Sequence, residues 1–405
     1  MTITLSERVR SLGESASVAA AQRVRELKAG GVPMLDLTIG EPDFDTPQHI
    51  KDAAVAAIAS GVTKYTPVTG LPVLRTAVLD KARRRTGMEY AEDQVTVGGG
   101  AKQVIFLALM ATVEPGTEVI VPAPYWVSYP DLVRVHGGTP VIATTTADDG
   151  FLLTPRTLRE KITPATRWLI LNAPANPSGN QYSPTELAGL AEVLREHPQV
   201  HVLADEIYDE LVYDGDSVGL LRVAPDLADR VLVVNGVSKT YAMTGWRIGY
   251  ATGERTLIAA INKLQSQSSS CPSSVSQLAA AEALTGDQSF LDSFLESYRE
   301  RRDLLGKLLA EIDGLDPLLP RGTFYSLVNC SGLIGAVTPA GTRLTNDSDV
   351  AVFLIEEANV ATIPGSAYGV SPYLRMSFAV REDDLELAAD RIRTAVARLD
   401  RGATR

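Results

Sequence analysis

The most informative part of this 405-residue sequence is VLVVNGVSKTYAMTGWRIGYA, residues 231–251. It begins with an apolar run at residues 231–235, passes through a glycine turn to Lys239, and ends in a second apolar run at residues 247–251. Apolar residues at consecutive positions are typical of a strand that helices cover on both faces. Because Lys239 directly follows such a strand, we expect it at the carboxyl edge of a sheet, where open α/β folds bind ligands.

Similar apolar runs recur along the chain and alternate with segments long enough for helices. Residues 102–113 and 184–196 are predicted helices, and Ser183 followed by a proline is a typical helix start. Alternating strands and helices predict an α/β fold with a mostly parallel sheet. We expect a large domain with roughly seven strands flanked by helices. The predicted strands are residues 94–97, 118–122, 140–143, 168–172, 201–204, 231–235 and 247–251.

The two ends of the chain differ from this central pattern. Residues 17–28 are predicted to form an amphipathic helix, and residues 278–310 one or two long helices. The C-terminal part then alternates strand and helix, with predicted elements at residues 322–329, 348–359, 373–378 and 383–399. We therefore expect two domains, a large one at residues 45–310 and a smaller α+β domain made from residues 1–44 and 311–405.

Composition and charge exclude several classes of protein. Lys and Arg total 38 and Asp and Glu total 49, and the net charge of −11 argues against nucleic acid and anionic membranes as partners. The longest apolar run, residues 104–113, is half the length of a membrane span, and the N-terminus lacks an apolar signal core. Cys271 and Cys330 are too few for a disulfide framework, so we expect a cytoplasmic protein with two reduced thiols. No metal site is expected, because a proline separates His197 from His201.

Lys239 and its neighbours suggest carbonyl chemistry. A lysine that is partly desolvated at a strand end has a lowered pKa and is nucleophilic toward carbonyls. Ser238 and Arg247 flank it, and the forked arginine side chain suits a phosphate. Together these residues suggest a phosphorylated aldehyde as ligand. The alternative is a surface lysine beside an ordinary arginine.

Three further turns follow predicted strands at the same edge. Asp205 ends one strand, where a carboxylate can hold a proton on a cofactor's ring nitrogen, and Tyr208 can donate to a phenolic oxygen. The alternative for Asp205 is a helix cap. The glycine turn at residues 98–103 can bind an anion through backbone N–H groups, but it is not the dinucleotide fingerprint. The prolines around Asn176 predict a rigid turn that can direct its amide, and the alternative is an ordinary turn without a function.

These motifs together resemble the class I aminotransferases, which are fold type I pyridoxal-phosphate enzymes, and are most similar to the bacterial aspartate aminotransferase subgroup. The stretch from Ser238 to Gly249 matches that family's cofactor-lysine motif along its whole length. The resemblance runs from about Gly40 to the C-terminus. It includes GEPDF at residues 40–44, KYTP at residues 64–67, PYWVSYP at residues 124–130 and YLRMS at residues 373–377.

The resemblance implies how pyridoxal 5′-phosphate would bind. Lys239 would bind its aldehyde and later shuttle a proton, while Asp205 would keep the ring nitrogen protonated. The other implied cofactor ligands are Tyr208 and Asn176 at the phenolic oxygen, Trp126 stacked on the ring, and Gly100, Ala101, Lys102, Ser238 and Arg247 at the phosphate. Tyr65 would reach the cofactor phosphate of the other subunit, which implies a homodimer with shared active sites.

The resemblance also implies a substrate site. Arg375 would bind the substrate α-carboxylate as a bidentate pair, with Gly40, Trp126 and Asn176 close by. The alternatives are a surface salt bridge for Arg375 and core packing for Trp126.

The distal end of the substrate site departs from part of the family. Some aspartate aminotransferases bind the distal carboxylate with an arginine from the second subunit, but residues 266–271 contain none. The bacterial subgroup instead implies Lys102 as the ligand, helped by a hydroxyl of Ser15 or Ser17. The alternative is that Lys102 contributes only a backbone N–H.

The implied activity moves an amino group between an amino acid and a 2-oxo acid, first of all aspartate and 2-oxoglutarate, by a ping-pong mechanism. One rival is an aromatic amino acid or prephenate aminotransferase, and another is a pyridoxal-phosphate lyase that uses the same lysine. A non-enzymatic regulator with this fold would need a DNA-binding domain, for which the chain has neither spare length nor a basic arm. The expected partners are therefore small molecules of amino acid metabolism.

Overall fold

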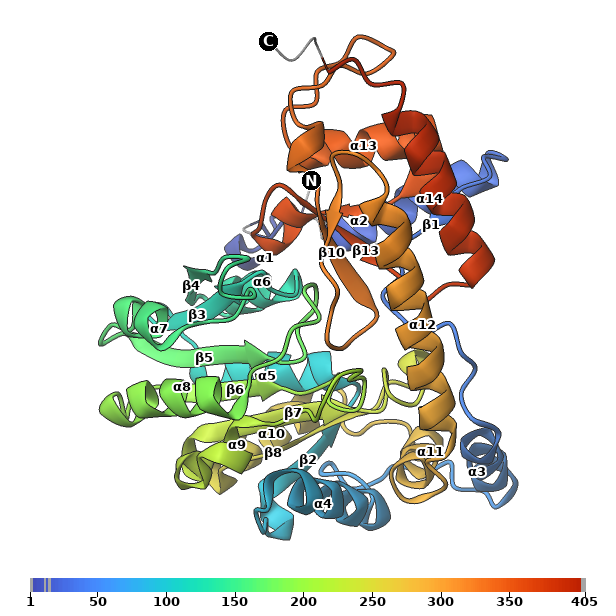
Figure 1. The fold of residues 1–405 in the computed structure, drawn as a ribbon. Helices are drawn as coiled ribbons and strands as arrows, with labels where there is room; N and C mark the ends of the chain where they lie inside the picture. Colours follow the sequence, from blue (N-terminus) through green and yellow to red (C-terminus); the bar gives the residue numbers. More distant parts are fainter. Residues whose placement is uncertain (1–2, 11, 14–15, 402–405) are drawn as a thin grey trace.

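The computed structural model describes residues 3–10, 12–13 and 16–401. A seven-stranded sheet lies at its centre with helices on both sides, and a smaller block with an antiparallel sheet lies above it (Figure 1). The strands of the central sheet are β2 Val95–Gly98, β3 Glu118–Ala123, β4 Thr139–Thr144, β5 Thr166–Asn172, β6 His201–Asp205, β7 Val231–Gly236 and β8 Gly249–Thr252. All seven predicted strands are present, and the predicted α/β class is confirmed.

The central sheet has the strand order β2-β8-β7-β6-β5-β3-β4, and β8 is antiparallel to both of its neighbours while the other pairs are parallel. β8 starts at Gly249, two residues later than predicted, because Arg247 has a left-handed backbone conformation with φ of 56°. The parallel register sets Asn172 of β5 opposite Asp205 of β6, and Asp205 opposite Val234 of β7. The carboxyl ends of these three strands therefore meet at one edge.

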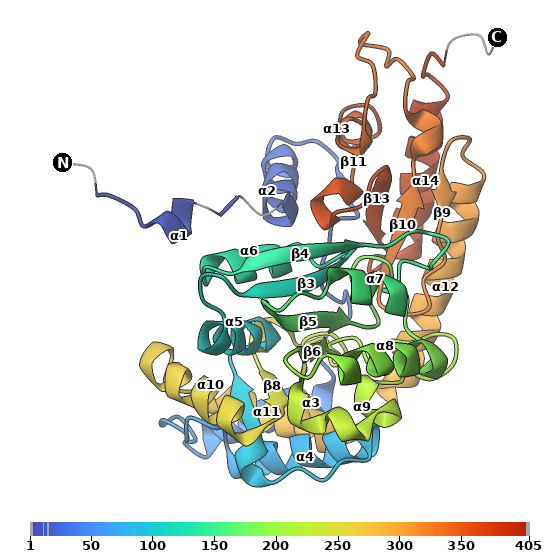
Figure 2. The same cartoon turned by 90° about the vertical axis from the view of Figure 1, so that its left-hand side faces the viewer.

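Helices cover both faces of the central sheet. Leu203 of β6 packs with helices α5 and α10, whereas its neighbours Val202 and Ala204 pack with α8 on the other face (Figure 2). This burial on both faces explains the consecutive apolar residues in the strands. The helices of these layers are α3 Gln48–Ala59, α4 Pro72–Thr86, α5 Ala101–Thr112, α6 Ser128–Val135, α7 Pro155–Lys161, α8 Pro184–Glu196, α9 Leu220–Val223, α10 Arg255–Ser268 and α11 Ser274–Thr285.

The predicted helices at residues 102–113 and 184–196 are confirmed as α5 and α8. α8 starts at the predicted residue because Ser183 and Glu186 exchange side-chain and backbone hydrogen bonds, which satisfies two N–H groups at the helix start. Helices α3, α4, α6, α7, α9 and α10 were not predicted. Helices α6, α7 and α9 are short, and α4 has three consecutive arginines in its last turn. In the part of the chain that the structure describes, no helix combines the length and the apolarity needed to cross a membrane.

The smaller block joins the two ends of the chain. β1 (Leu35–Asp36) pairs in parallel with β11 (Val360–Ala361), and α2 (Ala16–Ala29) lies beside this block (Figures 1 and 2). Its four-stranded antiparallel sheet has the order β12-β13-β10-β9. The remaining elements of this block are β9 Asp316–Pro317, β10 Tyr325–Asn329, α13 Asp347–Ala358, β12 Ile363–Pro364, β13 Tyr373–Ser377 and α14 Glu382–Val396, whereas α1 Glu7–Arg10 lies next to α6 (Figure 2). The predicted elements of this region are confirmed, although β10 begins three residues later than predicted.

The segment predicted as one or two long helices forms two, α11 and α12 (Phe290–Ala310). α12 is 21 residues long and reaches from the side of α3 and α11 up to the smaller block (Figure 1). Its Leu305 and Leu309 belong to the same hydrophobic core as Leu385 and Ile392 of α14. One helix therefore contributes to the packing of both parts, and the division into residues 45–310 and the two chain ends stays a prediction.

The close contact between β8 and the start of α5 generates a stability prediction. A Cβ atom at Gly249 would lie 2.1 Å from the backbone nitrogen of Ala101, so Gly249→Ala should push the two elements apart. We expect a loss of about 1–3 kcal/mol of unfolding free energy, the usual cost of overpacking, in urea denaturation. Gly245→Ala is the matched control, because no atom lies within 4 Å of a Cβ there. Equal stability of the two variants would contradict the prediction.

Candidate active site

A cavity of about 650 Å³ lies where β5, β6 and β7 end, between the central sheet and the smaller block. Most of the predicted site residues line it, although they come from distant parts of the sequence. They are Gly40, Ala101, Lys102, Trp126, Asn176, Asp205, Tyr208, Ser238, Lys239, Arg247 and Arg375. Two predicted residues do not line it. Gly100 lies behind Arg247, and Tyr65 is 92% exposed.

Lys239 follows β7 and its Nζ donates a hydrogen bond of 2.5 Å to the carbonyl oxygen of Gly40. Burial is the main cause that lowers the pKa of Lys239 to about 8. Glu41 opposes this shift in pKa, while the nearby guanidinium groups of Arg375 and Arg247 add to it. About a tenth of this amine is therefore neutral, and nucleophilic, at pH 7.

Asp205 ends β6 with its carboxylate directed into the cavity, and only 4% of it is exposed. Its Oδ2 accepts a hydrogen bond of 2.6 Å from the Tyr129 hydroxyl, and its Oδ1 accepts one of 3.2 Å from the backbone N–H of Ile207. Burial raises the pKa of Asp205 to about 6, and these hydrogen bonds oppose that shift. The alternative of a helix cap is wrong, because turns rather than a helix follow Asp205.

Tyr208 and Asn176 approach the cavity from two different loops. The Tyr208 hydroxyl lies 3.3 Å from the hydroxyl of Tyr325 on β10, and both rings are buried. The Asn176 backbone N–H donates to Oδ1 of Asn172 at 3.0 Å, which ties the Asn176 turn to the end of β5. The two side chains thus present polar groups to the same space.

Arg375 on β13 is a buried cation with no carboxylate partner among the described residues, and it is 3% exposed. Its Nη2 donates to the carbonyl oxygen of Thr38 at 2.6 Å and its Nη1 donates to Oδ1 of Asn176 at 3.3 Å, whereas its Nε has no hydrogen-bond partner. Its guanidinium also lies 4.2 Å from the ring centre of Tyr325. Because burying an unpaired charge is costly, this arrangement indicates an anion site, and the alternative of a surface salt bridge is wrong.

Arg247 forms a second cationic position against the start of α5. Its Nη1 donates to the carbonyl oxygen of Thr244 at 2.8 Å, and a Cβ at Gly100 would lie 2.2 Å from its Nη2. The backbone N–H groups of Ala101 and Lys102, the first residues of α5, have no acceptor within the helix. A helix start with free N–H groups beside an arginine suits an anion such as a phosphate.

Lys102 and Trp126 lie together on another wall of the cavity. The Nζ of Lys102 is 4.7 Å from the ring centre of Trp126, and no carboxylate in the described chain forms an ion pair with it. Burial, followed by the charge of Arg247, lowers the pKa of Lys102. Its side chain, and not only its backbone N–H, therefore reaches the cavity.

Sequence reasoning missed several lining residues. Tyr129 and Tyr325 lie within segments that the sequence singled out, but nothing in the local pattern indicated where their hydroxyls would lie. Arg25 of α2 also lines the cavity, for which the sequence held no signal. The predicted hydroxyl of Ser15 lies outside the described residues, and so does the side chain of Ser17.

Comparisons with known proteins agree with this geometry. The family model described as "Aminotransferase class I and II" matches residues 32–392. A relative from Rhizobium meliloti (strain 1021), named aspartate aminotransferase, is 48% identical over 97% of this chain and 96% of its own length. A relative from Cereibacter sphaeroides, named aspartate/prephenate aminotransferase, is 47% identical over 98% of this chain and 99% of its own length.

Solved structures of aspartate aminotransferases have the same fold as this chain. The crystal structure of the Rhizobium meliloti aspartate aminotransferase has 48% sequence identity and superimposes with a TM-score of 0.96, covering 98% of this chain and 100% of that one. The Thermus thermophilus aspartate aminotransferase with maleate has 40% identity and a TM-score of 0.91, covering 97% and 100%.

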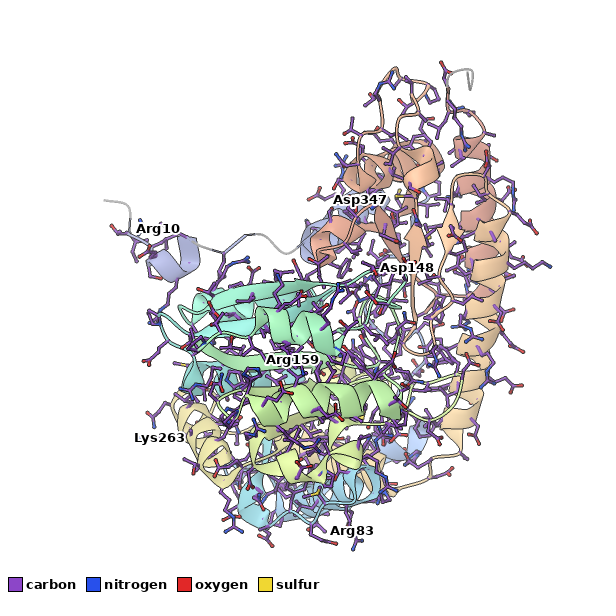
Figure 3. All side chains as sticks on the ribbon, turned by 60° about the vertical axis from the view of Figure 1, so that its left-hand side comes forward. Arg10, Arg83, Asp148, Arg159, Lys263 and Asp347 are labelled. Atoms are coloured by element: carbon purple, nitrogen blue, oxygen red, sulfur yellow. The ribbon has the colours of Figure 1, made fainter. Side chains whose placement is uncertain are left out.

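The lowered pKa of Lys239 predicts how this lysine reacts in the protein without any cofactor. Amine-selective acylation, read residue by residue by mass spectrometry, should label Lys239 with a midpoint near pH 8, because only the neutral amine reacts. Lys263 on the outer face of α10 (Figure 3) is the internal reference in the same sample. Labelling of Lys239 that begins only above about pH 10 would contradict the lowered pKa.

Proposed function

This chain belongs to the class I and II aminotransferases, and from that premise we propose that it transfers the amino group of aspartate to 2-oxoglutarate. The observation that carries the proposal is a desolvated amine with a lowered pKa, Lys239, which lies near two separate cationic positions, Arg375 and Arg247. One position suits the carboxylate of an amino acid and the other suits the phosphate of a cofactor. The two anions would bind on either side of the reacting amine.

We further propose pyridoxal 5′-phosphate as the cofactor, because the cavity residues fit each of its groups. Lys239 would take the aldehyde, Asp205 the ring nitrogen, and Tyr208 with Asn176 the phenolic oxygen. The phosphate would bind at Gly100, Ala101, Lys102, Ser238 and Arg247, and Trp126 would cover the ring. When bound, this cofactor supplies an electron sink for the negative charge that develops at Cα of the amino acid.

The chain's own contribution is to hold groups in place and to move one proton. Lys239, with its lowered pKa, can take the proton from Cα and return it, and a general base so placed contributes about 100- to 10,000-fold in rate. Because the pKa of Asp205 is about 6, its carboxylate is mostly ionised at pH 7 and can hold a proton on a ring nitrogen. The Tyr129 hydroxyl keeps that carboxylate in one orientation.

In this proposal, substrate recognition depends on two cations of the cavity, Arg375 and Lys102. Thr38 and Asn176 accept hydrogen bonds from the two Nη atoms of Arg375. Its Nε has no hydrogen-bond partner and could donate to a substrate α-carboxylate. Lys102 is the proposed ligand of a distal carboxylate, because its ammonium reaches the cavity unpaired. The Thermus thermophilus relative with maleate, a dicarboxylate, supports this part of the proposal.

A second copy of the chain would complete the site. Tyr65 is 92% exposed, and Val55, Ile58 and Val73 on α3 and α4 are large apolar side chains that are also exposed. A homodimer that covers this surface would let Tyr65 reach the other subunit's phosphate.

The proposal also includes the division into two domains, residues 45–310 and the two chain ends, and a cytoplasmic location. The two cysteines, which form no disulfide, support that location.

Prephenate is a second candidate acceptor, since the Cereibacter sphaeroides relative is named aspartate/prephenate aminotransferase. Ile39 and Ile105 give the cavity an apolar part that could contact a ring. Comparing kcat/KM for prephenate with that for 2-oxoglutarate, with aspartate as donor, would rank the two acceptors.

The activity test mixes the protein, pyridoxal 5′-phosphate, aspartate and 2-oxoglutarate and measures glutamate. We expect glutamate and oxaloacetate in equal amounts, and Lys239→Ala should reduce the rate by about 100- to 10,000-fold, because it removes the proposed general base. Lys263→Ala on the outer surface is the matched control. Release of ammonia or pyruvate from a β-substituted amino acid without glutamate formation would favour the lyase instead.

Lys102 generates a specificity prediction. Lys102→Gln should lower kcat/KM for aspartate by about 10- to 100-fold, because a charge-assisted hydrogen bond to the distal carboxylate is lost. Alanine has no distal carboxylate, so its kcat/KM should change by less than about threefold. Equal losses for the two substrates would show that Lys102 acts only through the phosphate.

A further inference from the structure

The turn that follows β6 presents its side chains to two different environments. Asp205 and Tyr208 line the active-site cavity, whereas Glu206, Asp209 and Glu210 do not. These three carboxylates instead lie near two cations of helix α4. One short turn therefore connects the proposed cofactor site to a second group of charged residues.

Lys81 and Arg85 are the cations of this second group. The Nζ of Lys81 lies 3.1 Å from Oδ2 of Asp209 and 3.0 Å from Oε1 of Glu210, and the Nε of Arg85 lies 3.4 Å from Oδ2 of Asp209. Lys81 is 5% exposed and Asp209 is 2% exposed. The Lys81–Asp209 pair is buried, and the loss of one partner of such a pair leaves an uncompensated charge.

Glu206 belongs to the same group and is also buried. Burial raises the pKa of Glu206 to about 7, while Arg85 and Lys81 oppose that shift and Asp209 adds to it. Gly219 provides the space for this side chain, since a Cβ there would lie 2.3 Å from Oε1 of Glu206. Three carboxylates and two cations therefore share this group.

The backbone of the turn is short and closely bonded. The N–H of Glu206 donates to Val234 of β7 at 2.9 Å, and the N–H of Asp209 donates to Glu206 at 3.0 Å. Asp209 is the residue after Tyr208, so a displacement of the Asp209 carboxylate would move the Tyr208 ring as well. The ion pairs with α4 therefore involve the residue next to Tyr208, in the same short turn as Asp205.

We propose that Lys81 and Arg85 are positioning residues of the active site, which hold the turn at residues 205–210 so that Asp205 and Tyr208 meet the cofactor. Neither cation lines the cavity, and neither touches the reacting groups. The proposal rests on the proposed function, because it concerns the cofactor end of that site. Arg375 and Lys102, the proposed substrate ligands, stand on other elements.

The main test is Lys81→Met, which keeps most of the length of the unbranched side chain and removes its charge. We expect the dissociation constant for pyridoxal 5′-phosphate to rise about 10-fold or more and kcat to fall about 10- to 100-fold, the effect of a small misplacement. KM for aspartate should stay within about threefold, because the substrate ligands are not displaced. Lys81→Arg should recover most of the cofactor affinity.

The matched control is Arg83→Met on the same helix. Arg83 also pairs with carboxylates, those of Asp80 and Glu89, but these pairs are exposed at the outer surface (Figure 3). Exposed pairs of this kind contribute little, so cofactor affinity and kcat should stay within about twofold of the wild type.

Two outcomes separate positioning from general stability. If Lys81→Met does not fold, Lys81→Met/Asp209→Asn removes both charges of the pair and should fold with the same loss of cofactor affinity. A folded variant that binds cofactor within twofold of the wild type overturns this proposal alone. A wild-type protein that takes up no pyridoxal 5′-phosphate overturns the proposed function, and this proposal with it.

Discussion

The parallel register of β5, β6 and β7 is the constraint on which the rest of the site depends. It places Asn172, Asp205 and Val234 at the same level, so the turns that follow these strands open into one cavity. A shift of one residue in β6 would turn Asp205 from the cavity toward a core face. The two-sided burial of these strands, with Val202 and Leu203 in opposite cores, makes such a shift costly.

Cationic side chains outnumber carboxylates in the lining of the cavity, although the chain as a whole is negatively charged. The chain carries a net charge of −11, yet Arg375, Arg247 and Lys102 reach the cavity without a carboxylate partner in the described residues. Burial makes the charge of Arg375 costly unless an anion binds, and desolvation also lowers the pKa of Lys239. The same desolvation therefore favours anionic ligands and supplies a neutral amine beside them.

Short apolar runs followed by chemically reactive residues were enough to predict much of this arrangement. Asp205 and Lys239 were predicted at strand ends because their strands are apolar on consecutive residues, and the structure places both there. The roles of Arg375 and Tyr65 came from the resemblance to a family rather than from any local pattern. Helix α4 was not predicted, since its three consecutive arginines obscure the apolar face that Leu74 and Val78 bury.

The order of the strands of the central sheet and the turns that follow them could be predicted from the sequence, because periodicity and turn residues act locally. The long-range contacts between side chains could not be predicted from the sequence. Tyr129 on Asp205, Thr38 on Arg375 and Lys81 on Asp209 lie far apart along the chain, and each contact exists only because packed elements bring their side chains together. The lowered pKa of Lys239 has the same origin, since desolvation is a property of the surrounding fold and not of the residue.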